Sequence, residues 1–216
     1  MPIEILLEFP KEKVHQKGII GEGTFGKVAK AEAWGLAGIE GPTIVALKTL
    51  KDNATGEDRK RLLDELGLLK NIGRHKHILS LVGCCTKTDD VYMLFDYMEL
   101  GNLQQYLRKS RECIATDYLE AGETSPVLTS GDLIIFAGQV ASAMEYLSSK
   151  KCVHGDLAAR NVMVNGGRIC KVTNFGRGSR VHNNAKEGSL RVRWMAPEAI
   201  KASEFSTKSD VGHWAS

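Results

Sequence analysis

Short apolar stretches alternate with glycines over residues 14 to 50, a pattern that favours strands and turns over long helices. The clearest strand candidate is Thr43–Leu50, and further strands are predicted over 78–82 and 91–97. Residues 29–33 are rich in alanine, so local propensity leaves both strand and helix open there. Residues 57–72 instead carry leucines at helical spacing, which predicts an amphipathic helix (Leu62, Leu66, Leu69).

The second half of the chain has a different pattern. Residues 109–131 are polar and contain glycine and proline, which predicts a long surface loop. Asp132 is the expected cap of a following helix over 132–149, whose apolar residues form one stripe (Leu133, Phe136, Val140, Met144, Leu147). Periodicity is lost after Val172 until about residue 196. The pattern predicts two lobes of one α+β domain, joined by a linker near 98–101.

Composition excludes several protein classes. The chain has 216 residues, of which 43% are hydrophobic and 25% are charged, and this excludes a disordered or collagen-like protein. The net charge of +3 gives no reason to expect a nucleic-acid partner. Five cysteines without C-x-x-C spacing indicate reduced thiols. No apolar run is long enough for a membrane helix, so we expect a soluble, cytoplasmic chain with no membrane segment.

A glycine motif, Gly21-x-Gly23-x-x-Gly26, precedes the strand that carries Lys48. Glycines let backbone N–H groups approach phosphate oxygens, but they also make ordinary turns. A lysine in an apolar strand is costly unless its ammonium meets an anion, although it can also snorkel at a sheet edge. Glu65, at the margin of the apolar helix face, is a candidate partner for Lys48; the alternative is an exposed pair with Arg61.

Three blocks follow in order further along the chain: His154–Asn161 (HGDLAARN), Asn174-Phe-Gly176 and Trp194–Glu198 (WMAPE). Together with the glycine motif and Lys48, they resemble the protein-kinase signature, in the wording of its tyrosine-specific branch. Other segments are similar to the fibroblast growth factor receptor kinase group, so that the resemblance spans residues 8–211 (Glu8–Pro10, Ala31–Ala33, Ile72–Lys76, Gly101–Leu103).

The resemblance implies a bilobal α+β protein-kinase fold that binds ATP and Mg²⁺. An antiparallel sheet with one helix would form the N-terminal lobe over 14–98, after an N-terminal extension over 1–13. Residues 99–216 would form a mainly helical C-terminal lobe, which is expected to be incomplete because the match stops after Val211 near the start of a large helix. In such receptors, this domain is the intracellular part of a single-pass membrane protein.

The resemblance also implies residue roles. The three motif glycines would cover the ATP phosphates, and Lys48 would contact the α- and β-phosphates while Glu65 holds it. Adenine would lie against apolar side chains and the connecting segment, with Phe95 at the rear of the pocket (Ile20, Val28, Ala46, Met163; Asp96 to Met98). Asp156 would accept the proton of a substrate tyrosine, and Arg160 would help shape the site for it. Asn161 and Asn174 would be the Mg²⁺ ligands.

The chain departs from the kinase pattern at positions that matter for catalysis. Asn174 stands where the family has the Asp that holds Mg²⁺, which removes a full negative charge from the ligand set. Gly155 replaces an arginine that pairs with a phosphorylated residue, and residues 174–198 contain no tyrosine. Arg177 and Arg191 replace the usual Leu and Pro, and Arg191 falls where a substrate peptide would dock.

Three hypotheses therefore remain open from the sequence. The chain is an ATP-dependent tyrosine kinase domain whose catalysis is impaired by Asn174 and Gly155. Alternatively, it is a pseudokinase that serves as a nucleotide-binding or protein-interaction scaffold. The third possibility is a truncated product without a stable fold of its own.

Overall fold

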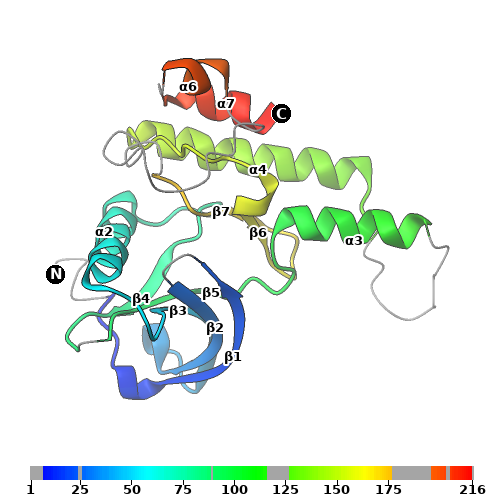
Figure 1. Cartoon of the computed structure of the whole chain (residues 1–216). Coiled ribbons are helices and arrows are strands. Elements are labelled where there is room, and N and C mark those ends of the chain that lie inside the picture. The colour runs from blue at the N-terminus through cyan, green and yellow to red at the C-terminus, as the bar shows by residue number, and fades with distance from the viewer. Residues whose placement is uncertain are drawn as a thin grey trace. The chain divides into compact units, whose positions relative to one another are not determined.

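The computed structural model describes residues 7–23, 26–88, 90–115, 127–176, 196–202 and 205–215. These residues form two compact units, which are drawn together in Figure 1. The first unit contains the chain up to Arg74 together with Leu79–Tyr97, and the second contains His75–Ile78 and the chain from Met98 onward. Strands dominate the first unit and helices the second, so the α+β prediction is confirmed.

The first unit is built on a five-stranded antiparallel sheet of order β1-β2-β3-β5-β4. Its strands are β1 (Val14–Glu22), β2 (Gly26–Trp34), β3 (Pro42–Leu50), β4 (Leu81–Cys85) and β5 (Tyr92–Asp96). The short 3₁₀ turns η1 (Lys11–Lys13) and η2 (Leu36–Gly38) precede β1 and follow β2. The prediction of a strand over 78–82 is wrong at its start, because Ile78 belongs to the second unit and bridges Val172 there.

Side chains of β2 and β3 alternate between two faces of this sheet. The alanine-rich segment is part of β2, and Ala29, Ala31 and Ala33 are all buried. Small residues suit this face because it packs into a dense apolar cluster with residues of β3 and β5 (Val45, Leu47, Leu94). Tertiary packing therefore decides between the strand and helix alternatives that local propensity left open.

Helix α2 (Gly56–Ile72) is the only long helix in the described part of the first unit. It begins with a capping box, in which Thr55 accepts a hydrogen bond from the Asp58 backbone N–H and the Asp58 carboxylate accepts one from the Thr55 N–H. Its apolar stripe is buried as predicted (Leu62, Leu66, Leu69, Ile72). Helix α2 thus has one face held against the rest of the unit, and Glu65 lies at the margin of that face.

The second unit contains the helices α3 (Leu103–Ala115), α4 (Ser130–Ser149), α6 (Pro197–Ala202) and α7 (Thr207–Ala215). A 3₁₀ turn, η3 (Ala159–Asn161), leads into a two-stranded antiparallel sheet of β6 (Val162–Val164) and β7 (Cys170–Val172). Helix α4 packs on β7, and α3 packs on β6 and η3 (Figure 1). This packing holds the segment between η3 and β7 in place from both ends.

Two predictions for the second unit need correction. The loop expected over 109–131 is helical up to Ala115, because Leu103, Tyr106 and Ser110 share a buried helix face that polar neighbours conceal in the sequence. Residues 116–126 lie outside the described residues. The cap of α4 is Thr129 rather than Asp132, whose carboxylate accepts a hydrogen bond from the Thr129 N–H at 2.8 Å and completes a capping box.

Candidate functional site

The Lys48 ammonium and the Glu65 carboxylate form an ion pair within the first unit. The Nζ atom lies 2.6 Å from Oε1 and 2.7 Å from Oε2, and the two side chains are only 18% and 19% exposed. Arg61 lies 3.3 Å from Glu57 and 3.9 Å from Asp58, on the same helix. The lysine in the apolar strand thus has a fixed anionic partner, which holds its positive charge at one place on the sheet.

Strand register places Lys48 among apolar neighbours on one face. Lys48 is paired with Val28 of β2, and Ala46 is paired with Phe95 of β5. Directly paired residues point to the same side of a sheet, so these four side chains share the face opposite the alanine core. Ile20 of β1 is 50% exposed. This face therefore offers a cation beside small and apolar side chains, as a nucleotide-binding surface requires.

The glycine motif lies where β1 turns into β2. The Gly23 N–H donates to the Gly26 carbonyl at 2.8 Å, and none of Gly21, Gly23 and Gly26 has a positive φ. A Cβ on Gly26 would lie 3.0 Å from the Thr49 carbonyl oxygen, whereas Gly21 has open space around it. Close packing therefore favours glycine at position 26, while positions 21 and 23 carry no such restriction. Residues 24 and 25 lie outside the described residues.

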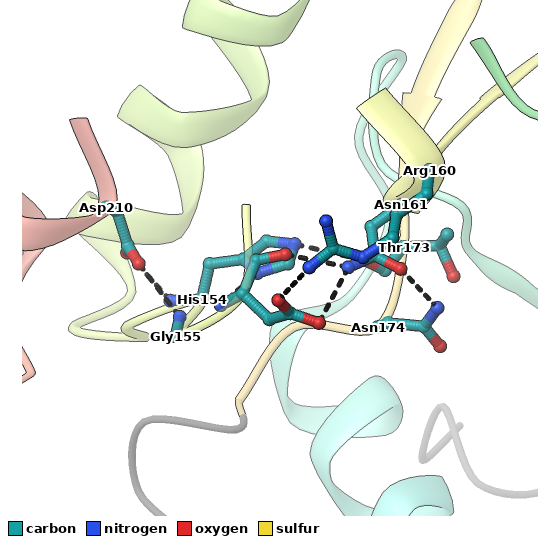
Figure 2. A network of polar contacts seen from close by, with 8 residues as sticks. His154, Gly155, Arg160, Asn161, Thr173, Asn174 and Asp210 are labelled. Carbon is teal, nitrogen blue, oxygen red and sulfur yellow. Dashed lines mark hydrogen bonds and ion pairs between the residues drawn. The ribbon is translucent and has the colours of Figure 1, made fainter. Parts of the chain in front are cut away.

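The predicted catalytic segment of the second unit is anchored by Asp210 of α7, a residue whose contact the sequence did not reveal. Its carboxylate is completely buried and accepts hydrogen bonds from the backbone N–H groups of His154 and Gly155, both at 2.8 Å. Figure 2 shows this network running from Asp210 through His154 to Asn161 and Asn174. A buried carboxylate with two such donors fixes the backbone immediately before Asp156.

The His154 ring connects two backbone segments of this network. Its ring is fully buried, Nδ1 accepts from the Asp156 backbone N–H at 3.2 Å, and Nε2 lies 3.0 Å from the Thr173 carbonyl. Because Nδ1 accepts, the proton must be on Nε2, which donates to Thr173. His154 therefore ties the backbone of Asp156 to the backbone that leads into Asn174.

Both oxygens of the Asp156 carboxylate are engaged. Arg160 donates from its guanidinium to Oδ1, and the Asn161 side-chain amide donates to Oδ2 at 3.0 Å. The same Asn161 amide nitrogen lies 2.7 Å from the Asp156 backbone oxygen. The three predicted residues are thus brought together around one carboxylate, which is held in one orientation beside a positive charge.

Asn174 contacts the same cluster through its amide group. Its Nδ2 donates to Asn161 Oδ1 at 3.0 Å, and its φ of 60° lies in the left-handed region that asparagine tolerates. The direction of this bond follows from Asn161, whose own Nδ2 already donates toward Asp156 and leaves only Oδ1 to accept. The two predicted metal ligands are therefore hydrogen-bonded to each other.

Gly155 has a φ of 77°, which is in the left-handed region where glycine is favoured. The backbone at this position is held by Asp210, and no side chain is available to pair with a phosphorylated residue. Arg177 and Arg191, the other departures from the kinase pattern, lie outside the described residues.

The predicted adenine-contacting residues are distributed over both units. Ile20, Val28, Ala46 and Asp96 belong to the first unit, and Met98 and Met163 belong to the second. Met98 is buried, and its carbonyl accepts a hydrogen bond from the Gly101 N–H at 3.1 Å. Met163 is half-buried in β6 and bridges Asn102. Each unit therefore carries part of the predicted adenine surface.

Comparison with known proteins agrees with the motifs. The family profile described as "Protein tyrosine and serine/threonine kinase" matches residues 14–215. The tyrosine kinase receptor Cad96Ca of Drosophila melanogaster is 43% identical over 209 residues, which cover 94% of this chain and 27% of that protein. A fibroblast growth factor receptor of Strongylocentrotus purpuratus is 39% identical over 216 residues, covering 98% of this chain and 22% of the receptor. The chain spans about a quarter of the length of either relative.

Proposed function

Because this chain belongs to the family of protein tyrosine and serine/threonine kinases, we propose that it is an ATP-binding tyrosine kinase domain whose phosphoryl transfer is impaired. The observation that carries the proposal of ATP binding is the Lys48–Glu65 ion pair. It keeps an ammonium on the face of the sheet that also carries Val28 and Ala46. A positive charge held there is suited to phosphate oxygens, and the apolar neighbours are suited to a base.

In the proposed reaction, a substrate tyrosine attacks the γ-phosphorus of ATP. A new oxygen–phosphorus bond forms, the bond to the β,γ-bridging oxygen breaks, and ADP leaves. The phenolic proton passes to the Asp156 carboxylate, which Arg160 and Asn161 hold in position.

The impairment follows from Asn174. Asn174 has a neutral amide where the kinase pattern has a carboxylate. This amide donates a hydrogen bond to Asn161 and offers no anionic oxygen. Each 1.4 kcal/mol lost from transition-state stabilisation costs about tenfold in rate. The same observation favours a second candidate function, a pseudokinase that acts as a nucleotide-binding or protein-interaction scaffold. Gly155 and the lack of tyrosine over 174–198 favour it as well.

The test is the phosphorylation of a tyrosine-containing peptide by the purified chain with radioactive ATP. Wild type is expected to be nearly inactive, and Asn174→Asp is expected to raise the rate by at least about tenfold. Asn165→Asp is the matched control, because it adds the same charge in the turn between β6 and β7, where Asn165 Oδ1 accepts from the Ile169 N–H. Adding Asp156→Asn to Asn174→Asp should abolish the gain. Rapid labelling by wild type would refute the impairment, and an inactive Asn174→Asp variant that binds ATP would favour the scaffold.

The place of this domain in a longer protein is also a proposal. Two relatives are receptors by their names, so we infer that this chain is the intracellular, cytoplasmic part of a receptor with a protein partner or substrate and no nucleic-acid partner. Among the helices that the structure describes, none has the length and apolar character needed to cross a bilayer.

A further inference from the structure

A hydrogen bond joins the two side-chain amides at the predicted metal position. Asn161 Oδ1 accepts the hydrogen bond from Asn174 Nδ2 at 3.0 Å, while Asn161 Nδ2 is committed to the Asp156 backbone and carboxylate. The oxygen of Asn161 that a cation would use is therefore already engaged by a donor from the same chain.

The donor set does not fit Mg²⁺. This small, hard cation prefers carboxylate oxygens, water and phosphate in octahedral geometry, and it gives up its water reluctantly. Here the nearby carboxylate, Asp156, is bound by Arg160 and Asn161, and positions 161 and 174 supply neutral amides only. To reach a cation with both amide oxygens, Asn174 would have to break its bond to Asn161 and turn its amide over. In the described part of the chain, no group of three or more His, Cys, Asp or Glu side chains is placed to hold a metal ion.

An aspartate at position 174 would reverse this balance. Its carboxylate has no N–H to donate, so it would face Asn161 Oδ1 with one acceptor against another. A cation between the two oxygens would remove that repulsion, whereas the asparagine removes it by donating a hydrogen bond. The single change from carboxylate to amide thus replaces a need for a cation by an internal contact.

We propose that nucleotide binding by this chain does not require a divalent cation, because the Asn174–Asn161 hydrogen bond takes the place of metal coordination. The proposal rests on the proposed function insofar as it assumes that the chain binds ATP. It adds that the affinity of the protein for metal-free ATP is about the same as its affinity for MgATP.

The first experiment measures ATP affinity of the full chain by calorimetry, once with MgCl₂ and once with EDTA. For wild type and for the matched control Asn165→Asp, the two dissociation constants are expected to agree within about twofold. For Asn174→Asp, the affinity with EDTA is expected to be at least about tenfold weaker than with MgCl₂, because the new carboxylate repels uncompensated phosphate. Wild-type binding that needs MgCl₂, or an Asn174→Asp variant that does not, would overturn the proposal.

A second experiment uses the metal alone, so that it is decisive even if ATP does not bind. In this experiment, Mn²⁺ is added to ¹⁵N-labelled protein without nucleotide, because this paramagnetic ion broadens the NMR signals of nearby nuclei. The side-chain amide signal of Asn161 should broaden in Asn174→Asp and stay sharp in wild type and Asn165→Asp. Equal broadening in wild type and Asn174→Asp, or broadening in neither, would overturn the inference. Failure of ATP to bind under every condition would instead refute the proposed function and leave the Mn²⁺ result to decide the metal question.

Discussion

The buried carboxylate of Asp210 is the contact whose loss should be most visible in stability. It lies in α7 and accepts the backbone N–H groups of His154 and Gly155, each at 2.8 Å. The conservative change Asp210→Asn keeps the size and shape of the side chain. It leaves one oxygen to accept a hydrogen bond and turns an NH₂ group toward the second N–H, so that two donors face each other.

The magnitude follows from these contacts. A hydrogen bond to a charged group is worth about 1.5 to 3 kcal/mol, and a buried donor left without a partner costs about 1 to 3 kcal/mol. Their combined loss, about 2.5 to 6 kcal/mol, is a large part of the roughly 5 to 15 kcal/mol by which domains are normally stable. Asp210→Asn should therefore unfold at a much lower urea concentration than wild type.

The assay is urea unfolding followed by circular dichroism, with the free energy of unfolding obtained by linear extrapolation. Glu198→Gln is the matched control, because it also converts a carboxylate to an amide, at an exposed position in α6. The control is expected to change stability by less than about 0.5 kcal/mol. If Asp210→Asn were within about 1 kcal/mol of this control, the anchoring role derived from the two hydrogen bonds would be refuted.

Three further outcomes are expected. Glu65→Gln should lower the free energy of unfolding by only about 1 kcal/mol, because its ion pair with Lys48 is partly exposed. The same change should weaken ATP binding at least about tenfold. Equal affinity of variant and wild type in a calorimetric titration would contradict the proposed role of the Lys48 ammonium. Burial, and secondarily the charge of a neighbouring histidine, lowers the pKa of His75 below its usual 6.5. The unfolded chain then binds more protons just below that pH, so stability should fall on acidification between about pH 7 and pH 5, and His75→Phe should reduce this fall in melting temperature. Burial raises the pKa of the Cys170 thiol to about 12. A thiol reagent at neutral pH should therefore modify half-buried Cys113 first, and Cys170 only when the protein unfolds. Modification of Cys170 in the folded protein as fast as that of Cys113 would contradict its burial.

Local patterns in the sequence were sufficient for parts of the fold. Helix α2 follows from leucines at helical spacing, and β3 follows from an apolar run, because both signals lie within a single element. The alanine-rich segment over 29–33 could not be assigned to a strand or a helix from sequence, because alanine suits a helix as well as a crowded sheet face. Helix α3 was missed over 109–115 because a polar residue, Ser110, occupies its buried face.

The chemistry of the site was accessible from the sequence as a set of residue types. The carboxylate at position 156, the arginine and asparagine that follow it, and the amide at position 174 all stand at motif spacing. Residue types specify which groups can donate and accept, and spacing along one short segment brings Asp156 and Arg160 within reach of each other. That much needs no knowledge of contacts between distant parts of the chain.

Only the tertiary structure decided how those groups are used. Asp210 lies 55 residues after Gly155 in the chain, so no local pattern could assign it to the Gly155 N–H. Asn174 lies 13 residues after Asn161, and the direction of their hydrogen bond depends on what Asn161 already donates to. Donors and acceptors are distributed among partners by folding, because each can be satisfied only by the groups that the fold brings within about 3 Å. The sequence determined which atoms are available, and the fold determined that two of them bind each other.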